Sequence, residues 1–260
     1  MSAEFDAVAI DYDFNFTETN IGKAQRALVW NYLKKHLPSK KLRILEVNCG
    51  TGADAQWLHA LGHEVIATDL SSEMISVAKQ KRASDISFQV AGFHDLKEKF
   101  EGQTFDLIFS NFAGLNCVSK LQLQAIQEDF SALLKPKGKF IGVFLGEYCW
   151  QERLYFRLKN QPDNINRRLS IHEANIDNKS TQQTHCFSPE ALKELFIDFN
   201  FIRQQPIGLL VSPSYFEAQL KHWPRLVRLL QSLESAVAIP KWANNADHFL
   251  IEFEVKKNCN

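Results

Sequence analysis

An acid, Glu46, stands four residues before the first glycine of the turn Gly50-Thr51-Gly52. Glycines let the backbone approach a ligand closely, and a helix that begins after them offers unpaired N–H groups. The spacing E-x-x-x-G-x-G differs from the G-x-G-x-x-G of dinucleotide-binding turns. A carboxylate beside the turn would repel a pyrophosphate, whereas it suits a ligand with an ammonium group. The pattern therefore predicts a nucleotide-like ligand that carries a positive charge near the turn.

A second acid, Asp69, ends the apolar run His63–Leu70 and lies 17 residues after Gly52. That distance is close to the roughly 20 residues that separate a glycine turn from a ribose-binding acid. A carboxylate at this place can accept hydrogen bonds from both ribose hydroxyls. In the competing interpretation Asp69 caps the next helix, but Ser71 and Ser72 can fill that role. The sequence therefore predicts a ribose contact at Asp69.

Short apolar runs alternate with helical patterns and place both acids at strand ends. The run from Leu42 to Val47 reads as a strand buried on both faces. The other predicted strands are His63–Leu70, Ile86–Ala91, Thr104–Phe112, Lys139–Leu145, Phe199–Ile207 and Asp247–Val255. The predicted helices are Gly22–Leu37, Ala53–Leu61, Ser71–Arg82, Leu121–Leu134, Pro189–Phe196 and a last helical region, Ser214–Ala238. The order predicts five β/α units, an insertion that includes a possible hairpin, and a final antiparallel pair of strands.

These motifs resemble those of the class I S-adenosylmethionine-dependent methyltransferases over about Phe5 to Pro136. Besides the E-x-x-x-G-x-G turn, Tyr12-Asp13 and Phe105-Asp106-Leu107-Ile108 resemble motifs of that family. The resemblance implies an α/β fold with a doubly wound, mostly parallel seven-stranded sheet in the order 3-2-1-4-5-7-6. The last strand is expected to be antiparallel, with helices on both faces and an insertion after strand 5. S-adenosyl-L-methionine is the implied cofactor.

The resemblance also implies which residues hold the cofactor. Tyr12 and Arg26 could bind its carboxylate, although a packing aromatic and a solvated helix charge are the plainer interpretations. The family's acid after strand 3 is missing, so we expect adenine against Phe93 or against a displaced Asp95. The predicted cofactor-binding residues are Tyr12, Arg26, Glu46, Asn48, Gly50, Gly52, Asp69, Leu70, Phe93, His94, Asn111 and Phe112.

The acceptor side is expected after strands 4 and 5. We predict Asn116, Tyr148, Trp150 and His185 as substrate contacts, and His185 or His94 as the catalytic base. The wider set of base candidates is His94, His172, His185, Tyr148 and Tyr215. Aromatic residues gather in the N-terminal segment and in the insertion, which favours a small, partly apolar acceptor under a lid. The aromatic residues in question are Phe14, Phe16, Tyr148, Trp150, Tyr155, Phe156 and Phe187.

Composition narrows the possible partners. The 260 residues include 30 basic and 30 acidic ones, and this balance argues against general nucleic-acid or membrane-surface binding. Five cysteines without a C-x-x-C pair, and an N-terminus without a secretory signal, predict a cytoplasmic protein without a metal site.

We therefore expect a single methyltransferase domain whose acceptor is a small molecule. We expect a lid and helix in 1–38, a cofactor-binding core in 41–146, an acceptor cap in 147–187 and the rest of the sheet in 188–260. A non-catalytic S-adenosyl-ligand-binding protein and an NAD-type enzyme are the alternatives, and the sequence leaves the oligomeric state open.

Overall fold

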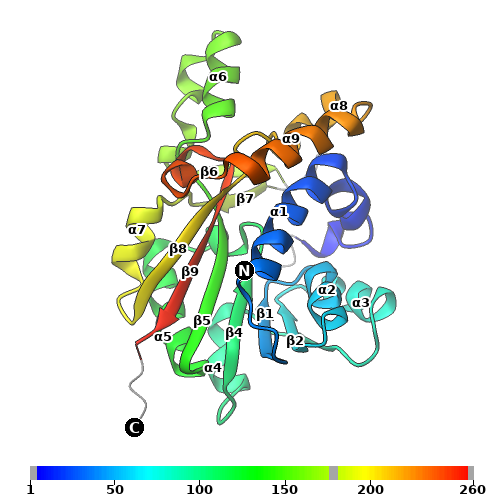
Figure 1. Cartoon of the computed structure of the whole chain (residues 1–260), viewed down its shortest axis with the longest axis vertical. Coiled ribbons are helices and arrows are strands. Elements are labelled where there is room, and N and C mark those ends of the chain that lie inside the picture. The colour runs from blue at the N-terminus through cyan, green and yellow to red at the C-terminus, as the bar shows by residue number, and fades with distance from the viewer. Residues whose placement is uncertain (1–4, 176–180, 257–260) are drawn as a thin grey trace.

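The computed structural model describes residues 5–175 and 181–256 of the chain. Its centre is a seven-stranded sheet, drawn as arrows in Figure 1. The strands of this sheet are β1 (Arg43–Val47), β2 (Glu64–Asp69), β3 (Ser87–Val90), β4 (Phe105–Ser110), β5 (Leu134–Leu145), β8 (Phe199–Ile207) and β9 (His248–Val255). Two further strands, β6 (His172–Asn175) and β7 (Thr181–Thr184), form a separate antiparallel hairpin.

The strands of the large sheet lie in the order β3-β2-β1-β4-β5-β9-β8. Because β8 and β9 are the sixth and seventh strands of this sheet, the predicted order 3-2-1-4-5-7-6 is confirmed. β9 runs antiparallel to both of its neighbours, and the pairs from β3 to β5 are parallel. β2, which follows β1 in the chain, lies on one side of β1, and β4 lies on its other side. A ligand crevice is therefore expected at the carboxyl end of β1.

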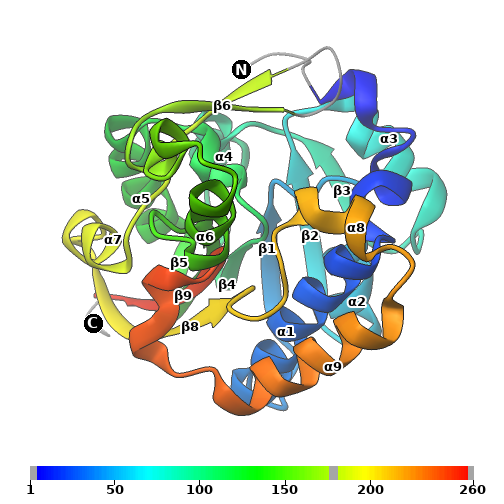
Figure 2. The ribbon, with the colours of Figure 1, turned by 90° about the horizontal axis from the view of Figure 1, so that it is seen from above.

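Helices cover both faces of the sheet (Figure 2), with α1, α2, α3 and α9 on one side and α4, α5 and α7 on the other. The helices are α1 (Asn20–His36), α2 (Ala53–Ala60), α3 (Ser72–Lys81), α4 (Leu96–Lys99), α5 (Lys120–Leu133), α6 (Trp150–Leu158), α7 (Pro189–Leu195), α8 (Glu217–Leu220) and α9 (Pro224–Val237). Successive strand residues point to opposite faces, so Ile44 packs in one buried core and Leu45 in the other. Both side chains are fully buried.

The predicted last helical region, Ser214–Ala238, is helical in the structure but is not one continuous helix. The structure divides it into a 3₁₀ turn at Ser214–Phe216, the short α8, and α9. Pro224 is the first residue of α9, where its missing N–H costs nothing. The ring also drives the preceding residue, Trp223, out of the helical region, and this ends the earlier piece.

Three segments lie above the carboxyl ends of the strands. The N-terminal segment contains a 3₁₀ turn at Asp6–Val8 and a π-helical turn at Asp13–Thr17. The insertion between β5 and α7 carries α6 and the β6–β7 hairpin, which confirms the predicted hairpin (Figure 1). The third segment is the connection from β8 to α8. Within the described part of the chain, no helix is both long and apolar enough to cross a membrane.

Candidate functional site

A cavity of about 860 Å³ lies over the carboxyl ends of β1, β2 and β4 and continues beneath the N-terminal segment and the insertion. Its size is within the range of about 300–1,000 Å³ that is typical of small-ligand sites. Nine of the predicted cofactor residues line it, namely Tyr12, Arg26, Asn48, Gly50, Asp69, Leu70, Phe93, Asn111 and Phe112. Residues far apart in the chain are therefore brought to one crevice at the place that the sheet order predicts.

Gly50 and Gly52 are each glycine for a different structural reason. Gly50 has a φ of +54° and lines the cavity, and a Cβ placed on it would lie 3.6 Å from the Tyr12 ring. Gly52 has a φ of +76°, and a Cβ there would lie only 2.6 Å from the Phe88 ring. Gly52 does not line the cavity. It allows α2 to pack closely on β3, so it supports the site without facing a ligand.

Asp69 joins the end of β2 to the glycine turn. Its Oδ2 accepts from Gly50 N at 2.8 Å, and its Oδ1 accepts from Ser71 N at 2.9 Å. The cap of α3 is Ser71, whose Oγ accepts from Met74 N at 3.1 Å. Burial raises the pKa of Asp69 above its ordinary value. Each carboxylate oxygen keeps a second lone pair, so Asp69 can still accept from ligand hydroxyls.

A buried cluster of charges lies between β1, α1 and α2. Arg26 forms an ion pair with Asp54, which also accepts from Trp30 Nε1 at 2.6 Å and from Asn111 Nδ2 at 2.9 Å. The alternative interpretation of Arg26 as a solvated helix charge is therefore wrong, because the residue is only 7% exposed. Its guanidinium lines the cavity and also lies 5.0 Å from the centre of the Phe112 ring.

Two atoms in this cluster have no hydrogen-bond partner among the described residues, Oε2 of Glu46 and Nε of Arg26. Burial, and then the charge of Asp54, raise the pKa of Glu46 well above its ordinary value. A buried carboxyl of this kind gains from a cation, and a buried guanidinium gains from a carboxylate. The amino-acid end of S-adenosylmethionine carries an ammonium and a carboxylate, so its chemistry fits these two unmatched groups.

The adenine end is apolar. Leu70 and Phe93 line the cavity with Met74, Ala91 and Leu96. Asp95 does not line it, because its Oδ2 accepts from Gly92 N at 2.8 Å and closes the turn after β3. Two residues were predicted as alternatives for contact with adenine. Phe93 lines the cavity, and Asp95 does not. His94 lies in the same turn and does not line the cavity.

Asn48 holds the turn after β1 against the loop after β4. Its Oδ1 accepts from Ser110 Oγ at 2.6 Å, and its Nδ2 donates to Asn111 O at 2.8 Å. A Cβ on Gly114 would lie 2.3 Å from Cγ of Asn48, so only glycine fits beside it. The amide of Asn48 thus has partners on both atoms. Its role is to fix the two loops that border the ligand.

Phe112 stands between the two halves of the cavity. It and Ala113 adopt left-handed φ values of +48° and +63°, which are uncommon for residues with a side chain. The Phe112 ring lies 5.5 Å from Phe16 and 5.6 Å from His248, centre to centre. Backbone strain of this kind persists where the surroundings impose it, and it often marks a ligand site.

The residues predicted for the acceptor side lie outside the cavity. Asn116 binds the backbone instead: its Nδ2 donates to His185 O at 2.6 Å, and its Oδ1 accepts from Leu145 N at 3.0 Å. Trp150 Nε1 donates to Leu209 O at 2.7 Å, and Tyr148 lies against Arg153. The backbone N–H of His185 also donates to Asn116 O at 2.8 Å. The side chain of His172 lies outside the described residues.

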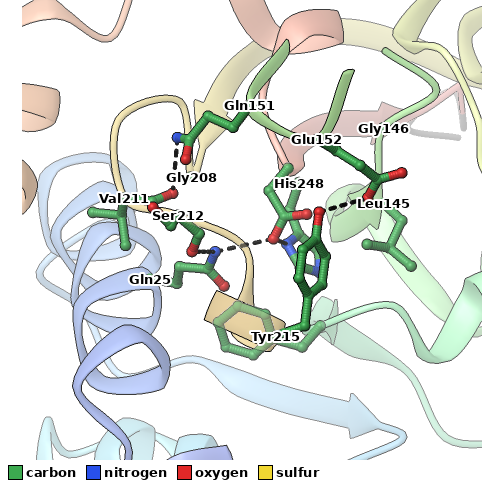
Figure 3. Close-up of polar contacts among 12 residues, drawn as sticks. Gln25, Leu145, Gly146, Gln151, Glu152, Gly208, Val211, Ser212, Tyr215 and His248 are labelled. Atoms are coloured by element: carbon green, nitrogen blue, oxygen red, sulfur yellow. Dashed lines mark hydrogen bonds and ion pairs between the residues drawn. The ribbon is translucent and has the colours of Figure 1, made fainter. Parts of the chain in front are cut away.

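Other residues line the acceptor half of the cavity. Tyr155 and Phe156 come from α6, Arg167 follows the helix, Tyr215 comes from the β8–α8 connection, and His248 is the first residue of β9. Figure 3 shows Tyr215 beside His248, with its hydroxyl directed at Glu152. The basic pair Arg167-Arg168 is visible in the sequence, and its place at the site depends on the fold of the insertion.

Glu152 and Asp247 hold this half of the cavity together. Glu152 accepts from both Arg167 and Arg168 and from Tyr215 Oη at 2.9 Å. Arg168 also donates to Oδ1 of Asp247 at 2.7 Å. Burial opposes the charge on Glu152, but hydrogen bonds and charge from the two arginines lower its pKa overall. The insertion is therefore tied to the start of β9 by buried ion pairs.

The fold and this crevice define a class I methyltransferase architecture, and comparisons with known proteins agree. Residues 44–138 match a family profile described as a methyltransferase domain. The chain superimposes on the crystal structure of an S-adenosylmethionine-dependent methyltransferase from Mesorhizobium loti with a TM-score of 0.58. That superposition has 18% identity and covers 89% of this chain and 99% of the other, and at this identity it shows the fold alone.

Two relatives have higher identity over shorter stretches. The demethylmenaquinone methyltransferase of Clavibacter sepedonicus is 30% identical over 145 residues, which cover 54% of this chain and 56% of the relative. The tRNA 5-carboxymethoxyuridine methyltransferase of Escherichia coli K12 is 37% identical over 79 residues, which cover 29% of this chain and 30% of the relative. The chain thus spans about half, or less, of the length of these relatives.

Residues 44–138 match the methyltransferase-domain profile, and the sheet order is that of the fold of the class I S-adenosylmethionine-dependent methyltransferase family. S-adenosyl-L-methionine is the cofactor of that family. The unmatched Glu46 and Arg26 atoms, the acid at the end of β2 and the apolar slot at Phe93 fit its three parts.

Proposed function

We propose that the chain transfers a methyl group from S-adenosylmethionine to a small-molecule acceptor. The observation that carries this proposal is a pair of unmatched buried groups: Arg26, which lines the cavity, and Glu46, which is buried near it outside the lining. An NAD-type ligand would bring a pyrophosphate to this place and would leave Glu46 without a cation. When bound, the cofactor supplies an electrophilic methyl group on a positively charged sulfur.

The chain's own residues bind and orient the ligands. Glu46 and Arg26 would hold the amino-acid end, Asp69 the ribose, and Phe93 with Leu70 the adenine. Phe112 separates these contacts from the acceptor half of the cavity and restricts the approach to one direction. Such alignment, together with exclusion of water, is the main contribution that a protein makes to a displacement reaction.

A small acceptor is favoured by the enclosure and lining of the cavity. Residues of the N-terminal segment, such as Phe16, and of the insertion, such as Tyr155 and Thr184, line it from above. The acceptor half is rich in aromatic side chains, which suit a small, partly apolar molecule. One relative acts on tRNA by its name, but the 30 acidic and 30 basic residues of this chain supply no excess charge for a phosphate backbone.

Titration calorimetry with S-adenosylhomocysteine and with NADH tests the cofactor assignment. We expect saturable one-to-one binding of S-adenosylhomocysteine and none of NADH. The Gly50→Val variant should lose this binding, because a branched side chain at positive φ distorts the turn beside Tyr12. A Gly62→Ala variant is the control, since Gly62 also has positive φ but lies far from the cavity lining. Tight NADH binding without S-adenosylhomocysteine binding would refute the proposal.

A further inference from the structure

His248 occupies a position at the edge of the sheet where a group can act on the acceptor. It is the first residue of β9 and pairs with Leu145, the last residue of β5. This places it at the carboxyl end of β5, beside the loop that follows β4. Its ring packs edge-on against Phe112 at 5.6 Å, on the acceptor side of that ring. His248 therefore lines the half of the cavity that the cofactor contacts leave free.

The two ring nitrogens of His248 have different surroundings. Nδ1 is enclosed and lies 3.0 Å from Oδ2 of Asp247, off the direction of an ideal hydrogen bond. No described residue forms a hydrogen bond with Nε2, and it is not among the enclosed atoms that lack a partner. The adjacent carboxylate favours the tautomer with its proton on Nδ1, which leaves the lone pair of Nε2 available on the cavity side.

Asp247 is itself held firmly. Its Oδ1 accepts from Arg168 Nη2 at 2.7 Å, its Oδ2 accepts from Gln25 Nε2 at 3.0 Å, and its backbone oxygen accepts from Arg168 Nη1 at 2.9 Å. Gln25, from α1, also donates from Nε2 to Ser212 O at 3.2 Å, as Figure 3 shows. Burial opposes ionisation, but the charges of His248 and Arg168 hold the pKa of Asp247 well below its ordinary value. Base, orienting carboxylate and anchoring arginine thus form a chain of the kind that positions a proton acceptor.

Aromatic rings surround the space that His248 faces. Phe16 and Phe112 border it on the cofactor side, and Tyr155, Phe156 and Tyr215 border it on the insertion side. Tyr155 packs edge-on against Phe156 at 5.3 Å and against Phe216 at 5.1 Å. Flat apolar walls favour a planar acceptor, because aromatic pairs gain from stacked or edge-on contact.

We infer that His248 is the general base of the reaction, that Asp247 is its positioning residue, and that the acceptor is a small aromatic molecule with a hydroxyl group. This inference rests on the proposed function. In the balanced reaction the acceptor oxygen forms a bond to the methyl carbon, and the carbon–sulfur bond breaks with its electron pair staying on sulfur. The hydroxyl proton passes to Nε2 of His248 and then to solvent. A base placed in this way contributes about 10²- to 10⁴-fold to a rate.

A methyl-transfer assay with matched probes tests the acceptor class. The probes are 2-naphthol, 2-naphthylamine and 2-naphthalenethiol, each with radiolabelled S-adenosylmethionine. We expect the ether product from 2-naphthol and little or no transfer to the amine and thiol. Transfer to the amine or the thiol alone, or to none of the probes by a protein that binds S-adenosylhomocysteine, would overturn the inference.

The His248→Gln variant tests the base. We expect its kcat on 2-naphthol to fall about 10²- to 10⁴-fold. In an assay above pH 8, where 4-nitrophenol is mostly ionised and needs no base, the kcat on this phenol should change by less than about threefold. An equal loss on both phenols would contradict a role in proton removal. Unchanged affinity for S-adenosylhomocysteine is the control for folding.

Nuclear magnetic resonance supplies a readout that needs no acceptor. In the full chain labelled with ¹⁵N-histidine, we expect neutral His248 to carry its proton on Nδ1, with Nε2 unprotonated. The assignment comes from the signal that disappears in His248→Gln. A proton on Nε2 with Nδ1 bare would overturn the inference. Because S-adenosylhomocysteine binding is measured separately, failure of this test is distinguishable from failure of the proposed function.

Discussion

The buried carboxyl group of Glu46 destabilises the protein without a ligand and favours the binding of a cationic ligand. Its carboxyl group is 1% exposed, and one of its oxygens has no partner among the described residues. Ionising it in that setting is unfavourable, because burial in a low dielectric disfavours charge. An ammonium group supplied by a ligand would reverse the balance. Glu46 therefore favours the binding of a cation next to its carboxyl group.

The Glu46→Gln variant should therefore bind S-adenosylhomocysteine more weakly and yet fold more stably at high pH. Loss of a hydrogen bond to a charged group predicts a decrease in affinity of about 1.5–3 kcal/mol, or roughly 10- to 150-fold. The pKa of Glu46 is raised in the folded state, so the wild type keeps its full stability below the unfolded value of 4.5 and loses it as pH rises through the folded value.

Calorimetry and urea denaturation across pH measure both effects. The stability gain of Glu46→Gln should be largest at alkaline pH and disappear below pH 4.5, the ordinary value for this group. The exposed Glu64 on the next strand is the matched position for a control Glu64→Gln variant. A variant that binds S-adenosylhomocysteine like the wild type would show that Glu46 faces no ammonium.

Asp69 has two roles in this structure, and its removal should affect both. Asp69→Ala should weaken S-adenosylhomocysteine binding by about 1.5–3 kcal/mol for each hydrogen bond lost to the charged group. It should also lower the free energy of unfolding by about 1–3 kcal/mol, because the N–H groups of Gly50 and Ser71 lose their acceptor. The sequence alone predicts only the first effect. Affinity equal to that of an exposed Asp85→Ala control would remove Asp69 from the ribose site.

At the scale of elements, the N-terminal segment is clamped to the sheet by Asp13. Its carboxylate accepts from Lys81 Nζ and Arg82 Nη2, each at 3.1 Å, and from the hydroxyl of Thr51 beside the glycine turn. Burial opposes this charge, but the Thr51 hydrogen bond and the two cations lower the pKa of Asp13 overall. The contacts join the segment to the same turn that faces the ligand.

Ligand binding should therefore slow hydrogen exchange in the N-terminal segment. With S-adenosylhomocysteine we expect added protection in Phe5–Ile21, and also in Glu147–Phe187, which contributes Tyr155, Phe156 and Arg167 to the acceptor half. Exchange in α9 should stay unchanged, because none of its residues lines the cavity. Protection confined to the glycine turn and Asp69 would show that these segments do not act as a lid.

Arg167 and Arg168 are neighbours with different structural roles, and their variants form a matched pair. Arg168 is 7% exposed and bonds to Glu152 and Asp247, so Arg168→Met deprives the buried Asp247 of its arginine partner and leaves Glu152 with Arg167 alone. We expect a loss of about 3–5 kcal/mol in the free energy of unfolding. The Arg167 side chain is 35% exposed, and Arg167→Met should cost about 1 kcal/mol or less. Urea denaturation of both variants measures the difference, and equal losses would contradict this assignment.

At the scale of the whole molecule, the equal number of acidic and basic residues sets an expectation for nucleic acids. Binding to bulk tRNA at about 150 mM salt should be weaker than a Kd of about 10⁻⁴ M, the weak end of non-specific binding. Fluorescence anisotropy with labelled tRNA measures it. Micromolar binding that falls steeply with added salt would reveal a local basic surface and reopen tRNA as an acceptor.

The part of the site that local patterns determine could be predicted from the sequence. Strand, turn and helix follow one another around Gly50, and Asp69 ends the next strand, so both reach the crevice through nearest-neighbour connections. The sheet order followed from resemblance to a family whose element order this chain shares. Gly52 was predicted as a ligand contact because spacing cannot show that a Cβ would meet Phe88 on another strand.

The acceptor half could not be predicted in the same way. His248 is 202 residues from Glu46 in the chain, and it reaches the cavity only through the antiparallel register of β9 on β5. Asn116 and His185 were expected at the substrate, but their backbone and side-chain groups bind each other. Long-range register and local hydrogen-bond competition decide these positions, and neither has a periodic signal in the sequence.

The insertion begins and ends at a single point on the sheet. Gly146 and Phe187 form a parallel bridge, and Phe187 N donates to Leu145 O at 3.2 Å. Since the closure cost of a flexible loop rises by only about 0.6 kcal/mol per doubling of its length, this junction can accept a replacement segment of another size. The insertion between Gly146 and Phe187 could be replaced by another segment without changing the carboxyl ends of β1, β2 and β4. The insertion would then select the acceptor, and the edge formed by β1, β2 and β4 would hold the methyl donor. A single junction separates these two parts of the chain.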